Sequence, residues 1–335
     1  MMSEINQNNL MPQKSRLFCP MERNNAEMFF SLVDYRNNYF TSDDPKKVLE
    51  FYDSFENRDQ LIQWMRERPK GVANIHEVDG DKDIIVVIPT ADFNGNYAME
   101  CRENVFKGLH IIFVESGEVP DPYFNYSHNC NVGIRKAMEY NPKWVVVTND
   151  DMEKIDAVEV MKEQLSRLDE DKYDIVFTKP SKYHSSIERI SQPSLLYKIY
   201  YKITNRFYGR SVIKISQKFQ IRYFLSPVSG IYSKLFRKGY QFLEINNFGI
   251  YSSKWISVAG EAVYEETFIN STEDSDVSIR TSFNKERIAR IDYSIGDMIG
   301  SSFGTGVDRR LRGLAGLTYL NYKWNSLLGE KGKTK

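Results

Sequence analysis

Cysteine is scarce in this chain of 335 residues. Cys19, Cys101 and Cys130 are odd in number and unevenly spaced, so the sequence predicts neither a disulfide framework nor a zinc site. Long apolar runs are also lacking. No stretch approaches the roughly 18 apolar residues of a membrane-spanning helix, and the first residues lack the apolar centre of a secretory signal. We therefore expect a protein of the reducing cytoplasm, at most peripheral on the cytoplasmic face of a membrane.

An excess of charge of either sign is absent as well. Lys and Arg number 45, Asp and Glu also 45, and the formal net charge is zero. A balanced chain offers no global electrostatic argument for nucleic acid, so we expect no nucleic-acid partner. Tyrosine is plentiful, with 21 residues. This abundance is compatible with binding of sugars or nucleotides and equally with packing of sheets.

The order of apolar segments predicts the fold class. Short β-branched runs at 83–89, 110–114, 144–148 and 173–178 are typical of buried parallel strands. Helical patterns alternate with them near 97–107, 131–140 and 155–168. This alternation predicts an α/β protein with a Rossmann-like, doubly wound, mostly parallel sheet. Ligands of such sheets bind at the carboxyl ends of the strands.

Helical segments flank this unit. Residues 1–40 are polar and Asn-rich, and 42–70 predict a helical hairpin that begins near Asp44-Pro45. Residues 309–335 predict an amphipathic helix. We therefore divide the chain into an N-terminal leader and hairpin (1–80), a main domain (81–305, with halves 81–180 and 181–305) and a helical tail (306–335).

Acidic and polar residues follow the predicted strands, whereas a glycine-rich phosphate loop is missing. A phosphate site without such a loop needs another counter-charge, which a divalent metal held by carboxylates would supply. Asp150-Asp151, after the third strand, fits that role. The alternative is an acidic loop that precedes a helix, where carboxylates favour the N-terminus.

Several segments between about 82 and 305 resemble glycosyltransferase family 2, whose members have the GT-A fold. These are IPTADF, VESG, HNCNVGIRKA, VVVTNDDM, VYEETFINSTEDSDVSIR and DMIGSS. The fourth resembles the family's D-x-D metal motif with Asn149 in place of the first Asp. In the fifth, Thr272-Glu273-Asp274 is similar to the TED sequence of cellulose and hyaluronan synthases.

The resemblance implies a role for each matching position. Asp274 would be the catalytic base, and Asp151 a metal ligand together with Asp297, which stands where the family has His. A carboxylate at that position suits Mn²⁺ or Mg²⁺. Contacts with the nucleotide sugar are implied for Pro89, Thr90, Asp92, Glu115, Asn131, Asp150 and Glu273.

The function that this resemblance implies is inverting transfer of a sugar from a nucleotide diphosphate to an acceptor hydroxyl. UDP is favoured as the nucleotide, with GDP and dTDP open, and a lipid-linked glycan is one candidate acceptor. A nucleotidyltransferase and a non-catalytic nucleotide- or glycan-binding protein are the alternatives. Asn149 and the missing His favour the second of these.

Three acidic positions also have simpler interpretations. Ser271 and Asp274 have the spacing of a helix capping box. Asp276 and Arg280 have that of an i,i+4 ion pair on one helix face. Glu115 could equally be a turn carboxylate.

A basic and aromatic segment, residues 195–222, completes the candidates. Its cations recur every four residues: Lys198, Lys202, Arg206, Arg210, Lys214, Lys218 and Arg222. Because such a row would wrap around a single helix, we expect Gly209 to divide two amphipathic pieces. The segment predicts either a solvated basic face or contact with an anionic membrane surface.

Overall fold

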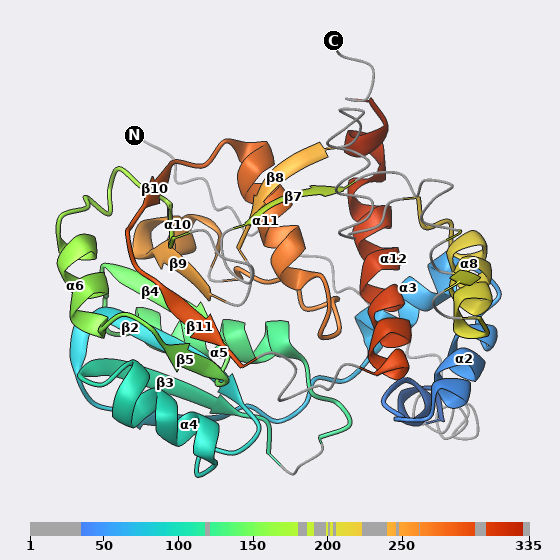
Figure 1. Ribbon diagram of the computed structural model, residues 1–335, viewed down its shortest axis with the longest axis horizontal. Helices are drawn as coiled ribbons and strands as arrows, with labels where there is room; N and C mark the ends of the chain where they lie inside the picture. The colour runs from blue at the N-terminus through green and yellow to red at the C-terminus, as the bar shows by residue number, and fades with distance from the viewer. Residues whose placement is uncertain are drawn as a thin grey trace, which may run out of the picture.

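The computed structural model describes residues 35–117, 121–179, 186–190, 199, 202–203, 206–222, 240–245, 248–260, 262–298 and 306–330. Its centre is a seven-stranded sheet of order β1-β3-β2-β4-β9-β6-β10 (Figure 1). The strands are β1 (Asn74–Val78), β2 (Asp81–Thr90), β3 (Leu109–Glu115), β4 (Trp144–Thr148), β6 (Ile175–Phe177), β9 (Phe248–Ser252) and β10 (Ile288–Arg290).

Five of the seven strands run in one direction, and β1 and β9 run in the opposite one. β3, β2 and β4 pair in parallel, as do β6 and β10, while β9 is antiparallel to both β4 and β6. The four predicted strands are confirmed, each within a few residues of its expected bounds. The position of β9 in the middle of the sheet, antiparallel to both neighbours, was not expected, because the alternation of strands and helices breaks down after residue 180. The α/β class and the mostly parallel sheet are therefore confirmed, with one reversed strand at the centre and one at the edge.

Helices cover both faces of the sheet. One face packs against α5 (Tyr126–Met138), α10 (Ser253–Val258) and α11 (Glu273–Asn284). The other packs against α4 (Asn96–Glu100), a π-helical turn at Cys101–Val105, and α6 (Val158–Ser166). Side chains of a strand alternate between the faces, so Ile85 and Val87 face α5 while Ile84, Val86 and Ile88 face α4. This is the doubly wound arrangement that the sequence predicts.

Two helix boundaries differ from expectation. α5 begins at Tyr126, five residues before the predicted start, because the Asn125 side chain accepts a hydrogen bond from the His128 N–H and caps it. α6 begins at Val158 rather than Ile155, because Met152–Lys154 form the short strand β5, which pairs with β11 (Ile295–Asp297).

The two ends of the described chain build one helical unit beside the sheet (Figure 1). It contains α2 (Pro45–Asp53), α3 (Arg58–Glu67), α8 (Tyr208–Lys218) and α12 (Val307–Glu330), which share one hydrophobic core. α2 and α3 confirm the predicted hairpin, and Asp44 caps α2 with Pro45 in its first turn. The Tyr52 hydroxyl donates to the Leu311 carbonyl at 2.6 Å. The C-terminal helix therefore packs as core and not as a surface tail.

α8 lies in the basic segment, and its apolar side chains belong to this core. Val212, Ile215 and Phe219 are buried against the helical unit, while Arg210, Lys214 and Arg222 stay exposed. Gly209 lies in the first turn of α8. Most of residues 195–205 lie outside the described residues, so the expected division into two amphipathic pieces stays a prediction. The amphipathic pattern of this part is explained by packing, which leaves only its cationic face for contact with a surface.

Part of the basic segment lies outside the residues that the structure describes. Lys198 and most of 195–205 lie outside the described residues, as do 1–34 and 299–305. Exposed Ile203 and Phe207 precede α8. A second two-stranded sheet joins β7 (Ser186–Ile190) to β8 (Tyr240–Glu244). Within the described part of the chain, none of the helices has the length and apolarity to cross a membrane.

Candidate active site

The carboxyl ends of three parallel strands meet at one edge of the sheet. Thr90 ends β2 and is paired with Glu115, which ends β3. β4 ends at Thr148 and is followed by Asn149, Asp150 and Asp151. The Thr90 hydroxyl donates to the Asp150 carboxylate at 2.7 Å. The strand order thus brings together residues that are 60 positions apart in the sequence.

The acidic pair at this edge is largely withdrawn from water. Burial, partly offset by the Thr90 hydroxyl, and the negative charge of Asp151 raise the pKa of Asp150 to about 6. Asp151 is only 5% exposed. The negative charge of Asp151 that raises the pKa of Asp150 would also be offset by a bound cation, since a cation relieves the same repulsion as a proton.

Asp297 lies next to this pair along the backbone. β11 pairs with β5 so that Asp297 is opposite Met152, and the Met298 N–H donates to the Asp151 carbonyl at 2.9 Å. The structure therefore brings Asp297 close to Asp151 in the fold. No group of three His, Cys, Asp or Glu side chains in the described ranges is arranged to enclose a metal ion.

The second acidic pair begins helix α11. Thr272 has the left-handed φ of +67° and makes no side-chain cap, and the helix begins at Glu273. The predicted capping box of Ser271 and Asp274 is therefore wrong. Asn270 is also left-handed, with φ of +52°. Two such non-glycine residues in three positions form a strained turn, and such turns persist only where the surrounding packing enforces them.

The packing that enforces this turn comes from α5 and α12. The Asn270 carboxamide accepts from the Tyr126 N–H at 2.8 Å and donates to the Phe124 carbonyl at 3.3 Å. On the other side, a Cβ added at Gly316 of α12 would collide with the Ser271 carbonyl oxygen. The glycine lets α12 approach the turn closely, so the position of Glu273 and Asp274 depends on the C-terminal helix.

These acids share one small pocket with the end of β4. Its enclosed volume is about 80 Å³. Its walls are formed by Tyr126, Asn149, Tyr264, Asn270, Glu273, Asp274 and Arg309. Asn149 and Asp274 are 125 positions apart in the sequence, and they come from a strand end and a helix start on either side of the pocket.

Burial shifts both acids of the pocket in the same direction. Burial, followed by the charge of Asp274, raises the pKa of Glu273 to about 8. Burial also raises the pKa of Asp274, against hydrogen bonds from its own backbone and from the Ser275 N–H. Glu273 is 8% exposed and its Oε2 has no hydrogen-bond partner among the described residues. At neutral pH the pair therefore tends to hold one proton, which leaves the other carboxylate as a base.

The other predicted contacts of the nucleotide sugar lie in different surroundings. Pro89 is buried inside β2, and Asp92 is exposed just beyond its end. Glu115 accepts from the Phe93 N–H at 2.9 Å and contacts His76 at 3.0 Å. The Phe93 N–H, and then His76, hold the pKa of Glu115 below its usual range against partial burial. Glu115 thus stays ionised at the strand end.

Asn131 is not part of this edge surface. Its side chain is 1% exposed, and its amide accepts from the Tyr264 N–H and donates to the Tyr264 carbonyl and to Glu266. The residue therefore ties α5 to the segment that precedes the acidic pair, and a direct contact with a nucleotide sugar does not follow from its position.

The expected ion pair of Asp276 and Arg280 is absent. Asp276 is fully buried and instead accepts from Lys323 and from the Trp324 indole, both at 2.8 Å. Arg280 turns away and donates to the Val263 carbonyl. The i,i+4 spacing permits the pair, but Lys323 and Trp324 of α12 occupy the carboxylate of Asp276 in place of Arg280.

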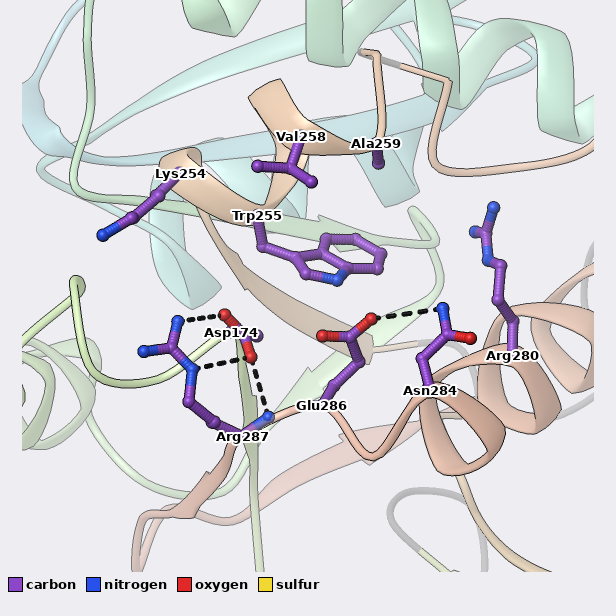
Figure 2. A pocket seen from close by; sticks show the side chains of 9 residues that line it. All are labelled: Asp174, Lys254, Trp255, Val258, Ala259, Arg280, Asn284, Glu286 and Arg287. Carbon is purple, nitrogen blue, oxygen red and sulfur yellow. Dashed lines mark hydrogen bonds and ion pairs between the residues drawn. The ribbon is translucent and has the colours of Figure 1, made fainter.

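A larger pocket, of about 260 Å³, lies at the opposite edge of the sheet. Figure 2 shows Trp255 at its centre, with Asp174 held by Arg287 before β6 and β10 begin. Arg287 donates from its Nε to Asp174 at 3.0 Å and from its backbone N–H at 2.7 Å. Asp174 is therefore held in its charged form by Arg287, while Glu286, the other acid of this pocket, accepts from the Asn284 amide at 3.3 Å.

Four residues that line the small pocket were not predicted from the sequence as site residues. They are Tyr126, Tyr264, Asn270 and Arg309. The only local signal is Asn270, because Asn tolerates a left-handed backbone better than most residues. Arg309 follows a segment outside the described residues and reaches the pocket only through the packing of α12.

Comparison with protein-family models and with curated protein sequences finds no match to this chain.

Proposed function

We propose that this protein is a metal-dependent glycosyltransferase with a GT-A fold. It transfers a sugar from a nucleoside diphosphate to an acceptor hydroxyl with inversion at the anomeric carbon. The observation that carries the proposal is the small pocket, in which Asn149, next to the Asp150-Asp151 pair, meets the buried acids Glu273 and Asp274. The segments that resemble family 2 supply both sides of this pocket.

Asp274 serves as the general base in this proposal. It is less buried than Glu273, and its raised pKa brings the carboxylate closer to the working range of a base at neutral pH. Glu273, with a pKa of about 8, holds a proton at pH 7 and so limits the negative charge beside the base. Asp274 accepts the proton of the acceptor hydroxyl as that oxygen bonds to the anomeric carbon, and the nucleoside diphosphate leaves from the opposite face.

A divalent cation fits the other acidic pair. Asp150 and Asp151 are adjacent carboxylates at a strand end, and Asp297 is a backbone neighbour. Mg²⁺ and Mn²⁺ prefer oxygen ligands, and Mg²⁺ is commonly held by one or two carboxylates with substrate phosphates and water completing the shell. A bound cation would neutralise the leaving diphosphate. A site with few protein ligands is therefore compatible with such a cation.

The donor would extend beyond the small pocket. A nucleotide sugar is larger than the enclosed 80 Å³, so its nucleoside would lie along the strand ends toward Thr90 and Glu115. Glu115 is already oriented there by the Phe93 N–H. UDP is the first nucleotide to test. For the acceptor, a glycan or a lipid-linked glycan stays a prediction, and membrane contact would fall to the cationic face of α8 and the residues before it.

The test is release of nucleotide from UDP-, GDP- and dTDP-sugars in the presence of Mn²⁺, Mg²⁺ or EDTA. Wild type and Asp151→Ala are compared, with calorimetry of donor binding in the same samples. We expect slow hydrolysis of one donor class that requires both metal and Asp151. Because slow turnover without acceptor is hard to detect, the calorimetry decides cases without measurable release.

Failure has two distinct forms. If no nucleotide sugar binds with metal present, the transferase proposal is wrong. If a donor binds with metal but neither hydrolysis nor transfer to glycan acceptors occurs, the protein is a nucleotide-sugar-binding protein on a transferase scaffold.

A further inference from the structure

The first turns of α12 face the small pocket. Arg309, Gly313 and Gly316 are spaced i, i+4, i+7 and so lie on one face of the helix. An added Cβ at Gly313 would lie 3.2 Å from Ser271 Oγ, and one at Gly316 would lie 2.9 Å from Thr272 Oγ1. Because both glycines rest against the turn that precedes Glu273, the same face presents Arg309 to the pocket, which it lines.

The charge of Arg309 reaches the acidic pair. Its positive charge counteracts the rise in the pKa of Glu273 that burial and Asp274 cause. Of the described residues that line the pocket, Arg309 alone is cationic, beside two acids and four neutral side chains. Arg309 is nevertheless exposed, so its guanidinium is positioned to contact a ligand that enters from solvent.

We propose that Arg309 binds the diphosphate of the donor, opposite the cation at Asp150-Asp151. This inference rests on the proposed function. Asn149 joins the pocket to Asp150 and Asp151, so phosphates held by a cation there would lie between the metal side and Arg309. A planar guanidinium forms paired hydrogen bonds with phosphate oxygens. Arg309 also lies in the first turn of a 24-residue helix, where the helix dipole favours an anion.

The proposed ligand is a nucleoside diphosphate and not an anionic acceptor. In an inverting transfer the acceptor approaches the base Asp274, and an anionic acceptor would be repelled by the carboxylate of Asp274, whereas the diphosphate carries its own cation. Arg309 stabilises the negative charge that grows on the leaving group as the bond to the sugar breaks, so its contribution increases toward the transition state.

The experiment measures binding of UDP and of UMP with Mn²⁺ by calorimetry, in wild type, Arg309→Gln, Arg309→Lys and the matched control Arg310→Gln. Arg310 is exposed on the same turn and does not line the pocket. GDP and dTDP, with their monophosphates, are used if wild type prefers one of them. Thermal unfolding of each variant is recorded in parallel.

We expect Arg309→Gln to weaken UDP binding about tenfold and UMP binding less than twofold, because only UDP carries the second phosphate. Arg309→Lys should recover part of the loss, and Arg310→Gln should resemble wild type. Equal UDP affinity in Arg309→Gln and wild type would overturn the inference while leaving the transferase proposal intact. So would equal losses for UDP and UMP, or losses that track a fall in melting temperature, since these indicate a structural role. If wild type binds none of the nucleotides, the proposed function fails first and this inference with it.

Discussion

Two buried acidic sites lie near the two ends of helix α11, and their carboxyl groups have opposite pKa shifts. At its start, Glu273 and Asp274 are buried beside each other, and burial raises the pKa of both. Toward its end, about 15 Å away at 1.5 Å per residue, Asn284 lines the pocket in which Arg287 holds Asp174. Burial alone would raise the pKa of Asp174, but the hydrogen bonds and charge of Arg287 outweigh it and lower that pKa.

Burial raises the pKa of Glu273 most, but the exposed fractions of the two acids are similar, 7% for Asp174 and 8% for Glu273, so the opposite signs follow from their partners. A buried acid with a close arginine is stabilised in its charged form and is chemically quiet. A buried acid beside another acid retains protons and can exchange them near neutral pH. The smaller pocket therefore holds the acids that can exchange a proton near neutral pH, whereas Asp174 in the larger pocket is held in its charged form.

The largest expected effect tests the chemical end. Asp274→Asn should lower the transfer rate by about 10²- to 10⁴-fold, the range for loss of a general base. Binding of the donor should change less than twofold, since the base contacts the acceptor. Steady-state transfer kinetics and calorimetry check this. Activity within tenfold of wild type would contradict the role of Asp274.

The matched change at the other end is Asp174→Asn. It removes the charge that Arg287 contacts, and we expect a loss of about 2 kcal/mol in the free energy of unfolding, moderated because half of the Arg287 side chain is exposed. The rate of the folded enzyme should be unchanged. The lowered pKa of Asp174 contributes stability above its unfolded pKa, about 3.9, and this is lost as pH falls through its folded pKa. The gap between variant and wild type in denaturant unfolding should thus close below about pH 4.

The dependence of the acidic end on the C-terminal helix can be tested with Gly316→Ala. The new Cβ collides with the Ser271 carbonyl and would displace the left-handed turn before Glu273. We expect roughly tenfold slower transfer and a loss of about 1 to 2 kcal/mol in stability. The control is Gly313→Ala, whose Cβ meets a rotatable Ser271 hydroxyl at 3.2 Å. Equal behaviour of the two variants would show that α12 does not set the turn.

The smallest expected effect is a pH dependence of the free energy of unfolding, with a sign opposite to that expected for Asp174. Because the pKa of Glu273 is raised to about 8 from an ordinary 4.5, the folded state binds a proton more tightly than the unfolded one. Its contribution to stability is complete below about pH 4.5 and is lost as pH rises toward 8. Glu273→Gln should remove this loss, and so gain on the order of 1 kcal/mol over wild type at pH 8 and little at pH 5. Urea unfolding at both pH values measures it, and a gain that is larger at pH 5 would reverse the assignment.

Local patterns predicted the parts of the fold that depend on near neighbours. β2, β3 and β4 are continuous apolar runs because they are buried on both faces, and α2 and α3 carry their own caps. The antiparallel position of β9 in the central sheet was not predicted, because the alternation of strands and helices breaks down after residue 180. The π-helical turn at Cys101–Val105 was not predicted either, because its sequence continues the pattern of an ordinary helix.

Some residues of the candidate site were likewise predictable from local sequence, and others were not. Asp150, Asp151 and Glu115 could be placed from the sequence, since residues after parallel strands converge at one edge. Arg309 and Asn270 could not, because a C-terminal helix and a strained turn bring them there. Asn131 matches the family segment, yet its amide is fully used within the protein.

By itself, then, the sequence determined which segments become strands and helices, and which acids follow strand ends, because hydrophobic period and capping act over a few residues. Only the tertiary structure decided how those acids behave. Asp276 was expected to pair with Arg280 but binds Lys323, and Asp174 and Glu273 take opposite pKa shifts at similar burial. A carboxyl responds to the charges and hydrogen bonds within a few ångströms of it, and here most of those come from residues far away along the chain.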